Sequence, residues 1–149
     1  MTQITVVIAE DEQPQRQALQ KMLQELMPEA YIVAVCEDGL SALEAMQQHQ
    51  PDLALLDIRM PGLSGLEVAR SASSNTQIIF TTAYDEYAVK AFEAGAVDYL
   101  LKPIKPERLQ QAINRVSERH QTKTAPDISN LIDALETKLR GAANKSIKW

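Results

Sequence analysis

The chain of 149 residues has one cysteine, no long apolar run and no excess of basic charge. A single cysteine excludes an internal disulfide and a zinc site built on several cysteines. Cys36 lies in an apolar segment, which favours a small buried core residue. No apolar stretch reaches the length of about 18 residues that a membrane span needs, and the start lacks the features of a signal peptide. We therefore expect a cytoplasmic protein without a membrane partner.

The charge balance further restricts the classes of partner that these residues could bind. The formal net charge is −5 and the pI is about 5.0, whereas a nucleic-acid-binding surface is basic. DNA binding by these residues themselves is therefore not expected. Hydrophobic residues make up 45% of the chain, which is enough apolar material for one globular core.

Short apolar segments and helical patterns alternate five times along the chain. The predicted strands end near residues 10, 36, 57, 82 and 102. A helical pattern follows each of them, at 14–27, 39–50, 66–69 and 88–94 and from residue 106 onward. Such alternation implies an α/β fold with a mainly parallel sheet and helices on both faces.

The pattern changes after the fifth helical segment. We expect a compact domain at 1–119, and a linker at 120–149 that contains an amphipathic helix at about 127–140 and leads to an output domain absent from this chain. The apolar residues on one face of that helix are Ile128, Leu131, Ile132, Leu135 and Leu139. Such a face needs a partner surface, which is either the chain's own domain or a second copy.

The stretch 53–65 organises the rest of the chain. Its apolar run is typical of a strand buried on both faces, and it ends at Asp57 before a loop with proline and glycines. Asp57 therefore lies at the carboxyl end of a strand, where open α/β sheets bind their ligands. The alternative for a lone aspartate is that it caps the next helix.

Other predicted strands bring polar groups to the same edge of the sheet. Glu10 and Asp11 follow the first strand, Thr82 ends the fourth and Lys102 follows the fifth. Taken singly, an acidic pair such as Glu10 and Asp11 more often belongs to a solvated turn, a threonine at a strand end has no further role, and a lysine is a surface charge. Together, three carboxylates repel one another unless a cation lies among them, and Mg²⁺ before Ca²⁺ suits an open oxygen site. With a hydroxyl and an ammonium added, the set is typical of phosphoryl transfer, with Asp57 as the nucleophile.

Four segments in this order resemble the receiver domain of two-component response regulators over roughly residues 3–119. They are Val7–Glu12, Leu56–Gly62, Thr81–Ala83 and Gly95–Pro103. The resemblance implies a flavodoxin-like (βα)5 doubly wound sheet with strand order 2-1-3-4-5. It also implies a signalling domain and not an enzyme, since such a domain promotes only its own phosphorylation and dephosphorylation.

The resemblance assigns a role to each residue at the acidic edge. Asp57 is expected to accept a phosphoryl group from a sensor histidine kinase, and Asp11 and Asp57 to bind Mg²⁺. Glu10 is expected to act on the metal through a bound water, and the backbone carbonyl of Arg59 to complete the metal site. Glu10 stands where the family more often has Asp, a departure that bears on metal affinity.

The resemblance also implies a switch. Lys102 is expected to contact the phosphoryl group, with a cis bond to Pro103, and Thr82 and Tyr99 form the switch pair. The phosphoryl group adds about −1.5 to −2 charges, which would draw Thr82 toward it and turn Tyr99 inward. The surface expected to change lies on the fourth helix, fifth strand and fifth helix, near Ala88, Lys90 and Ala91. A homodimer formed on phosphorylation is the expected consequence.

Residues 81–92 and 98–104 are similar to receivers that precede a LytTR-type DNA-binding domain. This resemblance implies a transcription regulator that contacts DNA only through the output domain. A dehalogenase-type enzyme is disfavoured because that family needs an Asp where Arg59 stands, and no nucleotide-binding glycine motif is present. The alternative that stays open is a receiver-like interaction module that is never phosphorylated, although the complete acid, threonine and lysine set speaks against it.

Overall fold

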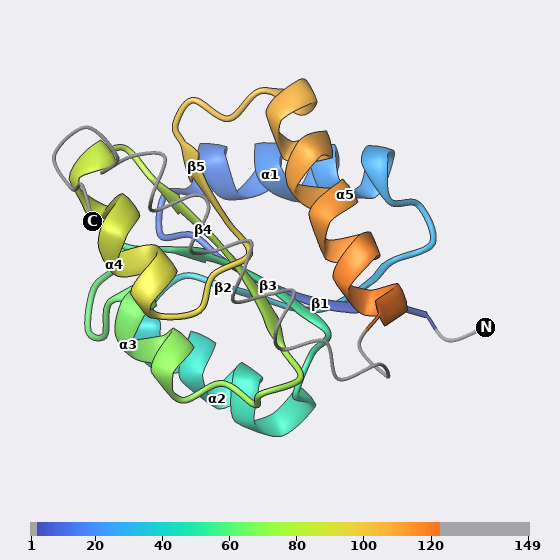
Figure 1. Cartoon of the computed structure of the whole chain (residues 1–149). Helices are drawn as coiled ribbons and strands as arrows, with labels where there is room; N and C mark the ends of the chain where they lie inside the picture. Colours follow the sequence, from blue (N-terminus) through green and yellow to red (C-terminus); the bar gives the residue numbers. More distant parts are fainter. Residues whose placement is uncertain (1–2, 123–149) are drawn as a thin grey trace, which may run out of the picture. The chain divides into compact units, whose positions relative to one another are not determined.

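The computed structural model describes residues 3–122, in which strands and helices alternate along the chain (Figure 1). The elements are β1 (Thr5–Ala9), α1 (Gln13–Leu26), β2 (Tyr31–Cys36), α2 (Gly39–His49), β3 (Leu53–Asp57), α3 (Gly65–Arg70), β4 (Gln77–Thr82), the 3₁₀ turn η1 (Asp85–Tyr87), α4 (Ala88–Glu93), β5 (Asp98–Leu101) and α5 (Pro106–Thr122). The predicted helix at 127–140 lies outside the described residues.

The strands form one five-stranded sheet in the order β2-β1-β3-β4-β5, and every neighbouring pair is parallel. The predicted fold class and strand order are therefore confirmed. The register places Asp57 beside Thr81 and Thr82 beside Leu101. Because the strands are parallel, the polar residues at their carboxyl ends are delivered to one edge of the sheet.

Helices cover both faces of the sheet, with α1 and α5 on one side and α2, α3 and α4 on the other (Figure 1). Each residue of β3 is buried, as its uninterrupted apolar run predicts. Leu55 packs in the layer under α1 and α5, whereas Leu56 packs with Phe80 and Met46 in the opposite layer. Cys36 is buried in that second layer, as expected.

Local signals explain where the helices begin and end. Ser64 caps α3 through a capping box with Glu67, so the alternative that Asp57 caps this helix is wrong. Asp38 caps α2 by accepting a hydrogen bond from the amide of Ser41 at 2.8 Å. Gly95 follows α4 with a φ of +87°, a left-handed conformation that favours glycine at a helix end.

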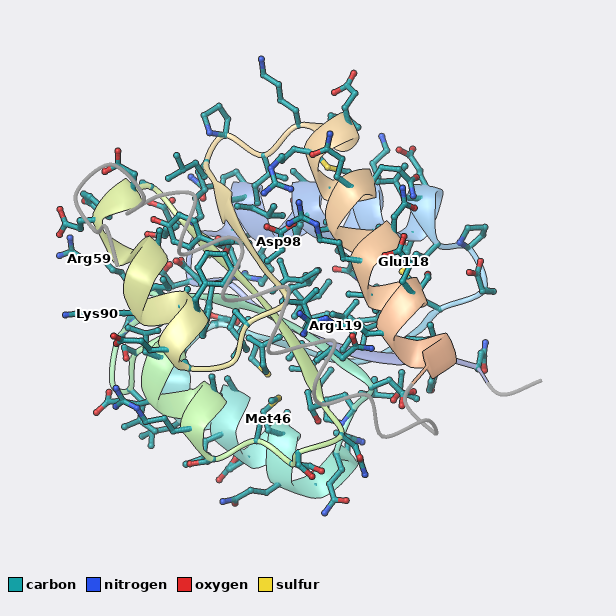
Figure 2. All side chains as sticks on the ribbon, in the orientation of Figure 1. Met46, Arg59, Lys90, Asp98, Glu118 and Arg119 are labelled. Atoms are coloured by element: carbon teal, nitrogen blue, oxygen red, sulfur yellow. The ribbon has the colours of Figure 1, made fainter. Side chains whose placement is uncertain are left out.

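One expectation about the surface needs correction. Ala91 is 0% exposed and belongs to the core, because it faces the sheet from α4. Of the three residues expected near the signalling surface, Lys90 is the exposed one, and it extends outward from α4 (Figure 2). Within residues 3–122, no helix has the length and apolarity that crossing a membrane requires.

A buried aspartate fastens the start of β5 to α5 (Figure 2). Asp98 is 2% exposed, and its carboxylate pairs with Arg108 at 2.7 and 2.9 Å and with Arg115 at 2.8 Å. Burial alone would raise the pKa of Asp98, but the hydrogen bonds from Arg108 and the Tyr99 amide, with the two guanidinium charges, lower it below its usual value.

We predict that Asp98→Asn lowers the free energy of unfolding at pH 7 by about 1.5–3 kcal/mol, since hydrogen bonds to a charged group are lost. The folded-state pKa of Asp98 is lowered, so its contribution is complete above the unfolded-state pKa of about 3.9 and disappears as the pH falls below it. Urea unfolding of both proteins between pH 7 and pH 3 tests this. A difference between the two proteins that stays constant over that range would contradict it.

Candidate functional site

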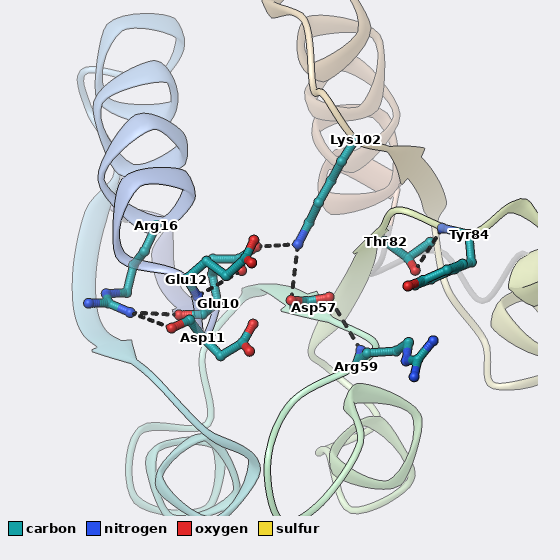
Figure 3. Close-up of polar contacts among 9 residues, drawn as sticks. All are labelled: Glu10, Asp11, Glu12, Arg16, Asp57, Arg59, Thr82, Tyr84 and Lys102. Atoms are coloured by element: carbon teal, nitrogen blue, oxygen red, sulfur yellow. Dashed lines mark hydrogen bonds and ion pairs between the residues drawn. The ribbon is translucent and has the colours of Figure 1, made fainter.

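The carboxyl ends of β1, β3 and β5 bring two buried carboxylates and one ammonium together (Figure 3). The Nζ atom of Lys102 lies 2.7 Å from Oε1 of Glu10 and 3.0 Å from Oδ2 of Asp57. Glu10 and Asp57 are 1% and 3% exposed. The residues predicted to converge from three separate strands therefore do so, and in this structure the cation between the two buried carboxylates is the lysine side chain.

Asp11 adds a third carboxylate to this cluster. One carboxylate oxygen from each of Glu10, Asp11 and Asp57 can be chosen so that all three lie within 4.8 Å of one another. Within the turn, Oε2 of Glu10 accepts a hydrogen bond from the amide of Glu12 at 3.1 Å. An all-oxygen donor set of this kind, with Asp11 more open to solvent than the other two, fits a hard divalent cation such as Mg²⁺.

The loop after β3 stays close to the carboxylate that it follows. The backbone amide of Arg59 donates to Oδ1 of Asp57 at 3.3 Å, which holds the first loop residues beside the cluster. The amide of Ile58 donates to the carbonyl of Thr81 at 2.9 Å and so extends the pairing of β3 with β4 past Asp57. The peptide bond between Lys102 and Pro103 is cis, as expected.

The crowding of these charges changes how readily Asp57 ionises. Burial is the largest effect and raises the pKa of Asp57, and the negative charge of Glu10 raises it further, while Lys102 opposes both. The result is a pKa of about 7 in the metal-free protein. Burial acts to lower the pKa of Lys102, but its pairing with the two carboxylates raises it above its usual value, so this lysine stays charged at neutral pH.

The predicted switch residues meet at a residue that the sequence did not single out. Thr82 is buried, and its Oγ1 accepts a hydrogen bond from the amide of Tyr84 at 3.2 Å. The carbonyl of Tyr84 accepts a hydrogen bond from the hydroxyl of Tyr99. The guanidinium carbon of Arg59 lies 4.6 Å from the centre of the Tyr84 ring. Tyr84 thus connects Thr82, Tyr99 and the loop after Asp57.

A second residue missed from the sequence is Arg16, in the first turns of α1. Its Nη1 atom donates to the carbonyl oxygens of Glu10 and Asp11, at 2.9 and 3.4 Å. The only sequence signal for it is a cation placed close after an acidic turn. Tyr84 carries an equally weak signal, an aromatic residue two positions after Thr82.

Comparisons with known proteins agree with this geometry. The model of the response regulator receiver domain matches residues 6–114. An uncharacterized response regulatory protein of Vibrio cholerae is 45% identical over 97% of this chain and 58% of its own length. The sensory transduction protein LytT of Oceanobacillus iheyensis is 38% identical over 91% of this chain and 58% of its own length. The chain therefore spans less than two thirds of these relatives.

The fold also matches solved structures. The receiver domain of AraT, a response regulator from Geobacillus stearothermophilus, superimposes with a TM-score of 0.74 at 33% identity. The match covers 83% of this chain and 99% of that domain.

We predict that the free energy of unfolding of Asp57→Asn, measured relative to that of wild type in EDTA, increases as the pH rises. The folded-state pKa of Asp57 is raised to about 7, so ionising it costs the folded wild type stability between the unfolded-state value of about 3.9 and pH 7. Urea unfolding at pH 5 and pH 8 should show the variant gaining about 1–3 kcal/mol on wild type.

The matched control is Glu29→Gln, which removes an exposed carboxylate between α1 and β2. This control shows how much of any pH-dependent difference comes from removing a carboxylate in general. If the stability difference between Asp57→Asn and wild type is the same at pH 5 and pH 8, the raised pKa of Asp57 is wrong.

Proposed function

Because this chain belongs to the family of response regulator receiver domains, we propose that it is a phosphoacceptor: Asp57 takes a phosphoryl group from the phosphohistidine of a sensor histidine kinase. The observation that carries the proposal is the buried carboxylate of Asp57, 3.0 Å from the ammonium of Lys102 and beside two further carboxylates. A structural aspartate needs no such cluster.

In the proposed reaction an oxygen of Asp57 forms a bond to phosphorus as the bond from phosphorus to the histidine nitrogen breaks. The nucleophile must be ionised, and the positive charge of Lys102 favours that form. Lys102 then neutralises an oxygen of the transferred group. Asp11, Asp57, the carbonyl of Arg59 and, through water, Glu10 would hold Mg²⁺, which supplies charge stabilisation at the phosphoryl oxygens.

The switch that we propose follows from the contacts of Thr82. Oγ1 of Thr82 accepts a hydrogen bond from the amide of Tyr84, and its own hydroxyl proton can be donated to a phosphoryl oxygen. A shift of the Thr82 side chain toward Asp57 to make that bond would pull on the amide of Tyr84. Movement of Tyr84 changes the position of the carbonyl that Tyr99 contacts. Tyr99 would then turn inward, and the face made by α4, β5 and α5 would change. Dimerisation through this face, or through the predicted helix at 127–140, would carry the signal.

The output that we propose is transcriptional. The resemblance of residues 81–92 to LytTR-class receivers supports it, as does the 38% identity to LytT. DNA would be contacted by an output domain outside this chain, since the net charge here is −5.

The test of the phosphoacceptor proposal is incubation with Mg²⁺ and acetyl phosphate, followed by intact mass measurement. We expect one phosphoryl adduct that requires Mg²⁺, is cleaved by hydroxylamine and is absent from Asp57→Asn. Asp52→Asn serves as the control, because Asp52 holds Thr5 at the opposite ends of the strands and should not affect the adduct. A folded wild type that binds Mg²⁺ and gains no adduct would favour the unphosphorylated interaction module.

We further predict that beryllium fluoride with Mg²⁺, as a mimic of the phosphoryl group, converts the protein from monomer to dimer in sedimentation velocity. Leu101→Asp on β5, where the side chain is 45% exposed, should weaken that dimer. Leu40→Asp on α2, where the side chain is 60% exposed, should leave it intact. An unchanged monomer with the mimic would remove the dimerisation model, and an intact Leu101→Asp dimer would exclude Leu101 from the interface and favour the predicted helix at 127–140.

A further inference from the structure

The turn Glu10–Glu12, between β1 and α1, places like charges close together. It carries Glu10 and Asp11, two of the three clustered carboxylates, which repel each other and Asp57. Its backbone is tied to the sheet by one bond, from the amide of Glu10 to the carbonyl of Cys36 at 3.0 Å. The bond from the Glu12 amide to Oε2 of Glu10 occupies an oxygen of the cluster itself. Something else must hold the backbone of Asp11 in place.

Arg16 supplies that contact from α1. Its guanidinium donates to the carbonyl oxygens of Glu10 and Asp11, at 2.9 and 3.4 Å, and its own amide donates to the carbonyl of Glu12 at 2.8 Å. The bond to Glu12 is the first backbone bond of α1 and would form with any residue other than proline at this position, so the contacts that belong to the Arg16 side chain are the two to Glu10 and Asp11. Neither guanidinium bond uses a carboxylate oxygen.

Arg16 contacts the turn on the side opposite to the carboxylate cluster. In Figure 3 the Arg16 guanidinium lies on the side of the turn away from Asp57 and Lys102, while the carboxylates of Glu10 and Asp11 extend toward Asp57. Holding the carbonyl groups on one side therefore restrains the backbone from which the two carboxylates extend on the other. Both bonds come from one nitrogen, Nη1, which lies one covalent bond farther from the backbone than a lysine ammonium would, on a stiffer group.

We propose that Arg16 is a positioning residue for the divalent-cation site: it holds the Glu10–Glu12 turn so that the carboxylate of Asp11 faces Asp57. This inference rests on the proposed function, because it takes the cluster to be a Mg²⁺ site. Arg16 acts through the turn and contacts neither the metal nor the phosphoryl group. Its charge alone would oppose a cation nearby, so positioning and charge predict opposite effects of its removal.

The experiment is a calorimetric titration of Mg²⁺ into wild type, Arg16→Gln, Arg16→Lys and Lys21→Gln. Loss of an outer contact to metal ligands typically weakens metal binding about 10–100-fold, and we expect Arg16→Gln to fall in that range. Arg16→Lys keeps the charge, and we expect weaker binding there too, since the shorter lysine side chain does not bring its ammonium to the position of Nη1 beside both carbonyl groups. Lys21→Gln removes an exposed charge from the same helix and should bind as wild type does.

A second readout separates positioning from a general loss of structure. The Mg²⁺ concentration for half-maximal phosphorylation by acetyl phosphate should rise by the same factor as the dissociation constant. The maximal rate at saturating Mg²⁺ should return close to the wild-type value, since Asp57, Lys102 and Thr82 are unchanged. If the maximal rate falls while the half-saturating Mg²⁺ concentration stays the same, the inference is overturned.

The outcomes of the titration are distinct. Tighter or unchanged Mg²⁺ binding by Arg16→Gln, in a protein whose wild type binds Mg²⁺, overturns the positioning role and leaves the phosphoacceptor function standing. A wild type that binds no Mg²⁺ overturns the proposed function itself, and this inference with it. Should Arg16→Gln fail to fold, Arg16→Lys decides: wild-type affinity in that variant overturns the inference, and weakened affinity with unchanged stability in EDTA supports it.

Discussion

The arrangement depends on the shared ammonium of Lys102, which lies between two carboxylates that are almost completely buried. An isolated carboxylate is costly to remove from water, and a second one beside it adds repulsion. Without Lys102 the edge of the sheet would hold two uncompensated acids among apolar residues. The pKa of Asp57, raised to about 7 although it pairs with this lysine, indicates that the compensation is incomplete. A site held in this state favours any further cation that can reach its oxygen atoms.

The parallel sheet is what makes this cluster possible. Glu10, Asp57 and Lys102 are 47 and 45 positions apart along the chain, yet each follows directly from a strand of the same sheet. The loop after β3 must also pass close to its own strand, and a Cβ atom at Gly65 would lie 2.3 Å from the carbonyl oxygen of Asp57. Gly65 therefore lets α3 begin against the strand that carries Asp57, and a larger residue would push the loop away from the cluster.

The features that could be predicted from the sequence are those that depend on hydrophobic periodicity and on the direction of the strands. The apolar runs and their alternation with helical segments predicted five mainly parallel strands, and the family resemblance implied their order. The convergence of Glu10, Asp57 and Lys102 at one edge of the sheet followed from the parallel direction. The contacts of Arg16 and Tyr84 could not be predicted, because they join side chains to particular backbone carbonyl groups across turns. Ala91 was misplaced for a related reason: a six-residue helix presents too short a pattern to tell which small residue faces the sheet.

The switch that we propose would depend on the contacts of Tyr99. The amide of Tyr99 donates to Oδ1 of Asp98 at 2.8 Å, and its carbonyl accepts a bond from Arg108 at 3.3 Å. Its backbone is therefore held to α5 through a buried ion pair, while its hydroxyl donates to the carbonyl of Tyr84, whose ring contacts Arg59 in the loop after Asp57. With the backbone held, movement of Tyr84 can be followed by rotation of the Tyr99 side chain without displacing β5. The signal that we propose is thus a change in side-chain packing, and the ion pairs of Asp98 with α5, together with the pairing of β5 with β4, hold the backbone against which Tyr99 would turn.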